Sequence, residues 1–248
     1  MLALSPFWLY HQEKPKVPWR RLALMRVTYI GHAAVEIKTE KHSILIDPFI
    51  TGNPVAKHKP EDFKPDAILL THGHSDHLGD AIPISKRTGA PIIAIFELAS
   101  YCQSKGAQAH GMNIGGPHSF PFGKVQFTPA FHSSSHDGHY LGMPCGVVLT
   151  TLENKKIYHA GDTALFGDMA LIGKLGLDLA FIPIGSYYTM GPDEALEAVR
   201  LLNPKIVIPI HYDTLPVIRQ DAEQFKKRVE SQTQSQVLIL RPGESREL

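Results

Sequence analysis

The sequence has few cysteines and no long apolar run, and each shortage excludes a class of protein. Its two cysteines, Cys102 and Cys145, lie far apart and outside any CxxC pattern. They predict buried thiols in a reducing compartment, the cytoplasm, and not a disulfide framework. No uninterrupted apolar run reaches the length of about 18 residues that a membrane-spanning helix needs. We therefore expect a cytoplasmic protein with no membrane partner.

An excess of charge of one sign is missing as well. The chain has 25 Lys and Arg against 24 Asp and Glu, a formal net charge of +1. A balanced charge provides no overall electrostatic attraction to nucleic acid, so we expect a small-molecule partner and no nucleic acid. The 43% of apolar residues indicates a globular protein with a sizeable core. Whether the chain forms a homo-oligomer is left open.

The first 24 residues lack the features of a signal peptide. Pro6 interrupts the apolar start, and the polar stretch HQEKPKVPWRR stands where a small-residue cleavage site is expected. Periodic sequence begins at Met25. We therefore expect residues 1–24 to be an extension outside the core, residues 25–248 to be a single domain, and Met25 to be the natural start. The intact mass of the protein from its source tests this prediction.

The rest of the chain predicts short strands, first in succession and then alternating with helices. This order occurs twice, which predicts an α/β (α+β) fold in which two β-sheets pack face to face with helices outside. Residues 111–123 are rich in Gly and Pro and predict loops around one weak strand. The predicted strands are 26–30, 34–39, 43–46, 67–70, 92–95, 124–129, 146–152, 156–159, 179–184, 206–210 and, last, 237–240. The predicted helices are 82–87, 97–105, 168–175, 192–202 and 220–231.

Histidine is abundant, and four potential metal ligands fall within six positions directly after a predicted strand. They form the motif HxHxDH, with His72, His74, Asp76 and His77. A single loop histidine is usually solvated or hydrogen-bonded. Four ionisable groups this close, with no Lys or Arg in the loop, would repel each other or lose hydration if partly buried. A bound cation removes this cost, and imidazole and carboxylate suit zinc or a harder ion such as manganese.

This motif resembles the signature of the metallo-β-lactamase superfamily. The resemblance implies a four-layer αββα sandwich, with further ligands at the ends of later strands, and each of these positions is filled here. It also implies that an early aspartate, Asp47, supports the site. The matching ligand positions are His132 after strand 124–129, Asp162 after strand 156–159 and His211 after strand 206–210.

The resemblance implies two divalent metal ions, zinc foremost, with manganese or nickel as alternatives. His72, His74 and His132 would hold one ion; Asp76, His77 and His211 would hold the other, with Asp162 bridging. His136 and His139 lie close to His132 in the sequence and compete for its position, which the strand-end context assigns to His132. His159 is expected to be a hydrogen-bond partner that supports the site without binding metal.

Four segments extend the resemblance to a prokaryotic branch of metal-dependent hydrolases related to ascorbate-6-phosphate lactonase. These segments are Tyr29–Ala33, Ala130–Ser134, Tyr158–Thr163 and Pro209–Thr214. Two metals can share a water and yield hydroxide at neutral pH, so we expect cleavage of a small ester, lactone or similar substrate. Penicillin hydrolysis is not expected, because true metallo-β-lactamases usually have a cysteine where Asp162 stands. Neither an RNA-gripping arm nor an appended flavin module is visible.

Several residues near the predicted site have weaker claims. We expect Asp76 and His32 to be catalytic, His32 as a proton donor or substrate contact; a turn histidine bonded to backbone is the equal alternative. Tyr188, in a loop with Tyr187 and Thr189, and Thr214 are candidate substrate contacts. A phosphodiesterase is the alternative enzyme. A non-catalytic metal-containing binding or regulatory protein is the alternative from another class.

Overall fold

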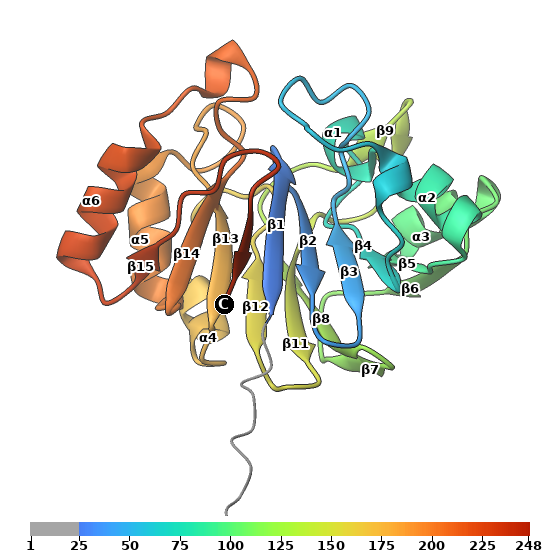
Figure 1. Ribbon diagram of the computed structural model, residues 1–248, viewed down its shortest axis with the longest axis horizontal. Coiled ribbons are helices and arrows are strands. Elements are labelled where there is room, and N and C mark those ends of the chain that lie inside the picture. The colour runs from blue at the N-terminus through green and yellow to red at the C-terminus, as the bar shows by residue number, and fades with distance from the viewer. Residues whose placement is uncertain (1–24) are drawn as a thin grey trace, which may run out of the picture.

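The computed structural model describes residues 25–248. The predicted N-terminal extension, residues 1–24, lies outside the described residues, so the prediction that Met25 is the natural start stays a prediction. Two seven-stranded sheets face each other, and helices cover both outer faces (Figure 1). The first sheet has the order β16-β1-β2-β3-β4-β5-β6 and the second β15-β14-β13-β12-β11-β8-β7. This arrangement confirms the αββα sandwich that the order of predicted elements and the resemblance implied.

The elements of each layer are as follows. The first sheet contains β1 (Arg26–Gly31), β2 (Ala34–Lys38), β3 (Ser43–Ile46), β4 (Ala67–Leu69), β5 (Ile92–Ile95), β6 (Ala109–Met112) and β16 (Ser245–Glu247). The second contains β7 (His118–Phe120), β8 (Gly123–Pro129), β11 (Cys145–Thr151), β12 (Lys156–His159), β13 (Leu179–Pro183), β14 (Ile206–Ile210) and β15 (Gln236–Val237). A small hairpin joins β9 (Ser135–His136) to β10 (His139–Tyr140). The α-helices are α1 (Ser75–Leu78), α2 (Ala81–Thr88), α3 (Phe96–Ser104), α4 (Met169–Gly173), α5 (Pro192–Leu202) and α6 (Ala222–Gln232); Pro60–Asp62 and Pro216–Ile218 are short 3-10 turns.

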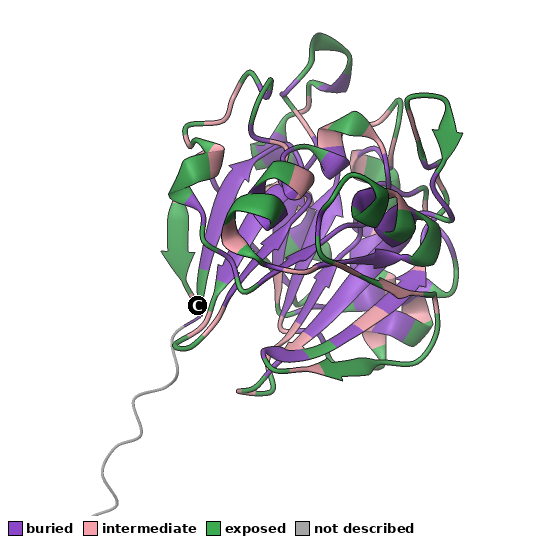
Figure 2. Cartoon of the chain, turned by 90° about the vertical axis from the view of Figure 1, so that its right-hand side faces the viewer, coloured by how far each residue is buried: buried purple, intermediate pink, exposed green. Residues whose placement is uncertain are grey.

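Three apolar clusters fill the three spaces between the four layers. The strand β13 shows how one segment serves two of them, because successive side chains of a strand point to opposite faces. Leu179 and Phe181 face the other sheet, whereas Ala180 and Ile182 pack against the helices outside. A strand buried on both faces therefore reads as a continuous apolar run. Figure 2 shows the buried strands beneath helices whose outer surfaces are exposed.

Strand direction brings the ends of several strands to one edge of the molecule. In the first sheet β3, β4, β5 and β6 run parallel, and β1 has the same direction because two antiparallel pairings separate it from β3. In the second sheet β12, β13, β14 and β15 run parallel, and β8 shares their direction through β11. The loops after β1, β4, β8, β12 and β14 therefore gather at the same edge. These loops contain the residues singled out in the sequence.

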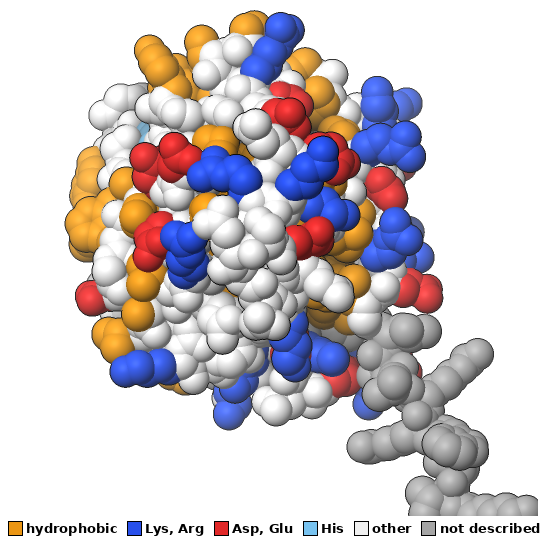
Figure 3. Space-filling model, turned by 90° about the vertical axis from the view of Figure 1, so that its left-hand side faces the viewer, with side chains coloured by type: hydrophobic (Ala, Val, Ile, Leu, Met, Phe, Trp, Pro, Cys, Tyr) orange, Lys and Arg blue, Asp and Glu red, His pale blue; other side chains and the backbone are white. Residues whose placement is uncertain are grey.

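The helix predicted at 192–202 is confirmed at both ends. Pro192 begins α5, the Gly191 N–H donates to the Glu194 carboxylate (3.1 Å), and Asn203 ends the helix with φ 45°. Basic and acidic side chains alternate on the face that α5 and α6 form (Figure 3), where Arg228 lies 2.6 Å from Asp193. None of the helices in residues 25–248 is long and apolar enough to cross a membrane. Both cysteines are buried and free, as predicted.

Three details of the predicted secondary structure are wrong. The last strand is β16, not 237–240: β15 ends at Val237, and Ser245–Glu247 pairs antiparallel with β1 in the other sheet. Its residues are polar and exposed, so no hydrophobic pattern indicated a strand. Two strands, β6 and β7, replace the one weak strand expected near 111–123. The second half of HxHxDH is helical, in α1, and not loop.

Candidate metal centre

The HxHxDH segment places four side chains on two short pieces of backbone. Its first two histidines, His72 and His74, come from the extended loop after β4, and Asp76 and His77 come from α1. Gly73, between His72 and His74, lets the backbone of the loop lie against Leu141, because a Cβ there would be only 2.5 Å from Leu141 Cδ1. The Gly73 N–H also donates to Ser134 Oγ (3.0 Å). The loop is thereby fixed to the segment that contains His132.

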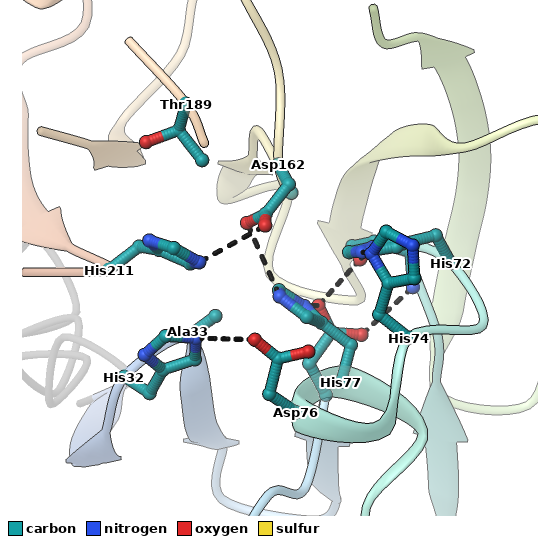
Figure 4. A network of polar contacts seen from close by, with 12 residues as sticks. His32, Ala33, His72, His74, Asp76, His77, Asp162, Thr189 and His211 are labelled. Carbon is teal, nitrogen blue, oxygen red and sulfur yellow. Dashed lines mark hydrogen bonds and ion pairs between the residues drawn. The ribbon is translucent and has the colours of Figure 1, made fainter. Parts of the chain in front are cut away.

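The potential metal ligands form one cluster, which consists of His32, His72, His74, Asp76, His77, His132, Asp162 and His211. Asp162 lies at its centre (Figure 4). Its carboxylate oxygens are 3.1 Å from His211 Nε2, 3.3 Å from His77 Nε2 and 3.6 Å from His132 Nε2. His77 lies in α1, after β4 of the first sheet, whereas His132 follows β8 and His211 follows β14 of the second, so one carboxylate joins segments that extend from both sheets. Asp162 itself is 3% exposed.

The ligating atoms fall into groups in which every atom lies within 4.8 Å of the others. One group is His72, His74 and His132; another is His32, Asp76, His77 and His211. A third, of His72, His77 and Asp162, overlaps the first two. The first group contains the three residues expected to hold one ion, and the second contains Asp76, His77 and His211 together with His32.

Buried polar atoms in the cluster have no hydrogen-bond partner, which is costly unless a ligand satisfies them. His77 Nε2 and Asp162 Oδ1 are two of these atoms: they lie 3.3 Å apart as an ion pair but without the geometry of a hydrogen bond. Burial lowers the pKa of His72, so its imidazole is neutral and offers a lone pair, the form that binds a cation. Burial alone would also lower the pKa of His77, but Asp162 and Asp47 outweigh it and hold that pKa well above its usual value, so a cation would bind His77 by displacing its proton. The donor set of imidazole nitrogens and carboxylate oxygens therefore fits divalent cations such as zinc or manganese.

Asp47 orients His77 from outside the group of potential ligands. This fully buried carboxylate accepts hydrogen bonds from the Thr71 N–H (2.8 Å), the Thr71 hydroxyl (2.6 Å) and His77 Nδ1–H (2.7 Å). The bond to Nδ1 turns His77 Nε2 toward Asp162. Carboxylate–histidine pairs of this kind fix the tautomer and orientation of metal-binding histidines. Thr71 and Ser134 were not predicted as site residues: Thr71 directly precedes the motif, whereas no sequence pattern distinguishes Ser134.

His159 supports the backbone beside the cluster. Its Nε2–H donates to Ala33 O (2.9 Å), and its Nδ1 accepts from the Gly161 N–H (3.1 Å). Ala33 follows His32, and Gly161 precedes Asp162. A second bond between the sheets, from the His211 N–H to His32 O (2.8 Å), lies beside it.

The side chain of His32 forms its hydrogen bonds with two other side chains. The alternative from the sequence, a turn histidine bonded to backbone, would have required a backbone partner. Its Nε2 lies 3.0 Å from Asp76 Oδ2 and its Nδ1 lies 3.1 Å from Thr214 Oγ1. Burial lowers the pKa of His32 to about 4, against the raising effect of the Asp76 hydrogen bond, so the ring is neutral at pH 7. Because a carboxylate only accepts, Nε2 bears the proton and Nδ1 accepts from the Thr214 hydroxyl.

The structure separates His132 from its competitors. The His132 ring lies 5.1 Å from that of His72 and 5.0 Å from that of His74. His136 and His139 lie in the β9–β10 hairpin, with their rings facing Tyr101 at 5.9 and 6.2 Å.

The candidate substrate contacts differ in position. Thr214 is buried against His32, whereas Tyr188 is 52% exposed and forms no side-chain hydrogen bond to the cluster residues described above. Thr189, next in the chain, lies on the Asp162 and His211 side of the cluster (Figure 4).

Two residues of the cluster and Asp47 beside it have left-handed backbone, which is uncommon outside glycine. They are His32 (φ 60°), Asp47 (φ 46°) and His211 (φ 54°), each directly after a strand of one of the two sheets. Such conformations persist where surrounding contacts fix them, and they concentrate at functional sites. Here the hydrogen bonds of Asp47 and the backbone bond from His211 to His32 provide those contacts.

Comparison with known proteins identifies the family. A family model described as "Beta-lactamase superfamily domain" matches residues 42–212, so the chain belongs to the β-lactamase superfamily. The chain is 53% identical over 230 residues to a "UPF0173 metal-dependent hydrolase" of Pelotomaculum thermopropionicum, covering 90% of this chain and 100% of that protein. It is 50% identical over 228 residues to a protein of the same name from Bacillus cereus, covering 89% and 99%.

Two solved structures illustrate the range of the fold. Igni18, described as a novel metallo hydrolase from Ignicoccus hospitalis, has 42% identity and a TM-score of 0.85, covering 91% of this chain and 98% of that chain. An isothiocyanate hydrolase from Delia radicum gut bacteria has 21% identity and a TM-score of 0.71, covering 90% and 98%. The second likeness concerns the fold alone.

Proposed function

We propose that this chain is a metal-dependent hydrolase that holds two divalent cations and cleaves a small ester or lactone. His72, His74 and His132 would hold one cation; Asp76, His77 and His211 the other. Zinc suits the imidazole-rich set best, with manganese or nickel as alternatives. The observation that supports this most is Asp162, whose carboxylate lies within 3.6 Å of a histidine from each set. The names of the curated relatives and of Igni18 agree with the proposal.

The bound cations would supply Lewis acidity that lowers the pKa of water and stabilises negative charge on the reacting oxygens. The residues of the chain then have separate tasks. Asp76 accepts a hydrogen bond from His32, which outweighs the opposing effect of burial and keeps the pKa of Asp76 below its usual value. Asp76 is thus an anionic ligand that also faces solvent, with 35% of its side chain exposed. Asp76 only accepts, so it selects the His32 tautomer with the proton on Nε2, and Thr214 Oγ1 contacts the other ring nitrogen at 3.1 Å.

Removal of metal tests the proposal directly. We expect elemental analysis to find about two ions per chain. Dialysis against a chelator should remove them, lower the melting temperature and abolish hydrolysis of p-nitrophenyl acetate and of a γ-lactone. Zinc, manganese or nickel should restore both properties, because an ion bound only by the folded state stabilises it.

The alternatives give different results in the same assay. Hydrolysis of bis(p-nitrophenyl) phosphate in preference to both carboxyl substrates would indicate a phosphodiesterase. Metal binding without turnover of any of the three would favour a non-catalytic binding protein. Absence of bound metal, together with no response to added ions, would contradict the proposal.

Substitution of His32 tests its catalytic role. Asparagine is the suitable replacement because it tolerates the left-handed backbone at this position and is too short to reach Asp76. We expect turnover to fall by roughly 10²-fold, the lower end of what a proton-transfer group contributes, with metal content unchanged. Thr214→Val should also lower turnover, but by less than H32N does. A fall in metal content in H32N would instead identify His32 as a ligand of the second ion.

A further inference from the structure

Large apolar side chains that remain exposed are concentrated around the metal centre. Ten such residues are exposed within residues 25–248, and only Leu152 and Leu171 lie away from the edge where the site is. Concentrated apolar exposure marks a binding surface, whereas scattered residues need no explanation. The eight residues at this edge are Phe96, Phe131, Tyr140, Met143, Tyr187, Tyr188, Leu215 and Val217.

Three of these side chains line one pocket that begins at the first group of histidines. Phe131, Tyr140 and Met143 form its walls, and its volume is about 710 Å³. His132 and Ser133 also line it, and Ser133 Oγ lies 3.4 Å from His74 Nε2. The pocket is therefore continuous with the proposed reaction centre. Its volume lies within the usual range for small-molecule sites.

Away from His132, the lining of the pocket has no charged side chain. No Lys, Arg, Asp or Glu occurs among its lining residues, which apart from His132, Tyr140 and a run of serines are apolar. Burial of an ion against such walls would cost its hydration without compensation. An uncharged hydrocarbon group would instead gain about 0.8 kcal/mol for each CH₂ removed from water.

Phe131 is anchored through its backbone and one face of its ring, although 64% of the residue is exposed. The Phe131 N–H donates to Thr163 Oγ1 (3.0 Å), and Phe131 O accepts from the Ala164 N–H (3.1 Å). The ring packs on Phe166 with centroids 5.4 Å apart. Thr163 directly follows Asp162, so the same backbone that places the central carboxylate also holds this ring in the pocket. A wall fixed before binding loses little entropy when a ligand covers it.

We propose that this pocket binds an unbranched, uncharged hydrocarbon chain of the substrate, attached to the ester that the metal centre cleaves. This proposal rests on the proposed function and names its substrate class: esters with a medium-length apolar chain. The chain belongs either to the acyl half or to the alkoxy half of the ester. In both cases hydrolysis adds one water across the acyl C–O bond and yields a carboxylic acid and an alcohol.

Rates across two homologous series test the proposal. We expect kcat/KM to rise about fourfold per CH₂, from p-nitrophenyl acetate to hexanoate or from ethyl to hexyl acetate, whichever series places its chain in the pocket. In Met143→Ser the dependence should fall to less than about twofold per CH₂. Leu152→Ser is the matched control, since Leu152 and Met143 are both 55% exposed but Leu152 lies at the opposite end of β11. The control should keep the full dependence.

Binding of products provides a readout that does not depend on turnover. Calorimetry of the metal-loaded protein should show tighter binding of hexanoate or hexanol than of acetate or ethanol, with the difference lost in M143S and kept in L152S. Hydrolysis with no dependence on chain length in either series would overturn the pocket while leaving the proposed reaction intact. Chain-dependent binding without hydrolysis would support the pocket and contradict the reaction.

A third result would give the apolar edge another role. If phosphatidylcholine vesicles bind the wild type but not M143S, while neither monomeric series shows a chain-length dependence, the edge contacts a lipid surface and the proposal is wrong.

Discussion

Replacement of Asp162 with asparagine should abolish hydrolysis and strip most of the bound metal. Asparagine keeps the volume of the side chain but removes the negative charge that lies within 3.6 Å of His77, His132 and His211. No other carboxylate lies in the group formed by His72 and His77, so these imidazoles would face a cation without an anionic ligand between the two sites. A loss of several kcal/mol of metal binding corresponds to roughly a thousandfold, at 1.4 kcal/mol per factor of ten.

The measurement is metal content by elemental analysis, together with hydrolysis of p-nitrophenyl acetate. Glu36→Gln is the control: Glu36 is another carboxylate buried in a strand, where it accepts a hydrogen bond from the Ser43 hydroxyl (2.7 Å), but it lies outside the cluster. We expect E36Q to keep its metal and its activity. Unchanged metal content and turnover in D162N would refute the central position of this carboxylate in the proposed mechanism.

The parts of the fold that could be predicted are those in which local pattern and tertiary burial agree. Strands such as β13 and β14 are apolar on both faces, so their sequences were sufficient to locate them. The HxHxDH part of the cluster could be predicted from the close spacing of its own ligands, whereas His132, Asp162 and His211 were expected from the family resemblance, which places ligands after later strands. Strand direction then brings these ends together, as the topology confirms.

The parts that could not be predicted depend on contacts between distant segments. The strand β16 has the polar sequence SRE and exists because it pairs with β1 across most of the chain length. The bond between His32 and Asp76 joins the turn after β1 to α1, 44 positions further along the chain, and no spacing rule links the two residues. The pocket beside His132 combines Phe131 with Tyr140 and Met143 only because the β9–β10 hairpin folds back over the site.

Substitution of Asp47 should separate the stability of the fold from the affinity for metal. Asp47→Ala leaves the Thr71 N–H, the Thr71 hydroxyl and His77 Nδ1–H without their acceptor in a fully buried position. Loss of a buried hydrogen-bonded charge costs about 3–5 kcal/mol, and alanine is also disfavoured at φ 46° by roughly 1 kcal/mol. At about 2–4 °C per kcal/mol for a chain of this size, we expect the metal-free protein to melt roughly 10–20 °C lower.

Asp47→Asn should lower the affinity for metal more than the stability of the metal-free protein. Asparagine tolerates the left-handed backbone, and its carbonyl oxygen can still accept from Thr71, so the metal-free stability should fall by less than half as much. The uncharged amide supports the Nδ1–H of His77 poorly, however, and we expect metal affinity to fall about 10- to 100-fold. Asp80→Asn is the matched control, because Asp80 is likewise a buried carboxylate that accepts backbone hydrogen bonds, from the N–H groups of Ile50 (3.1 Å) and Thr51 (2.7 Å), and no hydrogen bond joins it to a histidine of the cluster. Titration with zinc in a competing chelator should show weaker binding in D47N and unchanged binding in D80N; equal affinities in both would mean that Asp47 stabilises the loop without orienting His77.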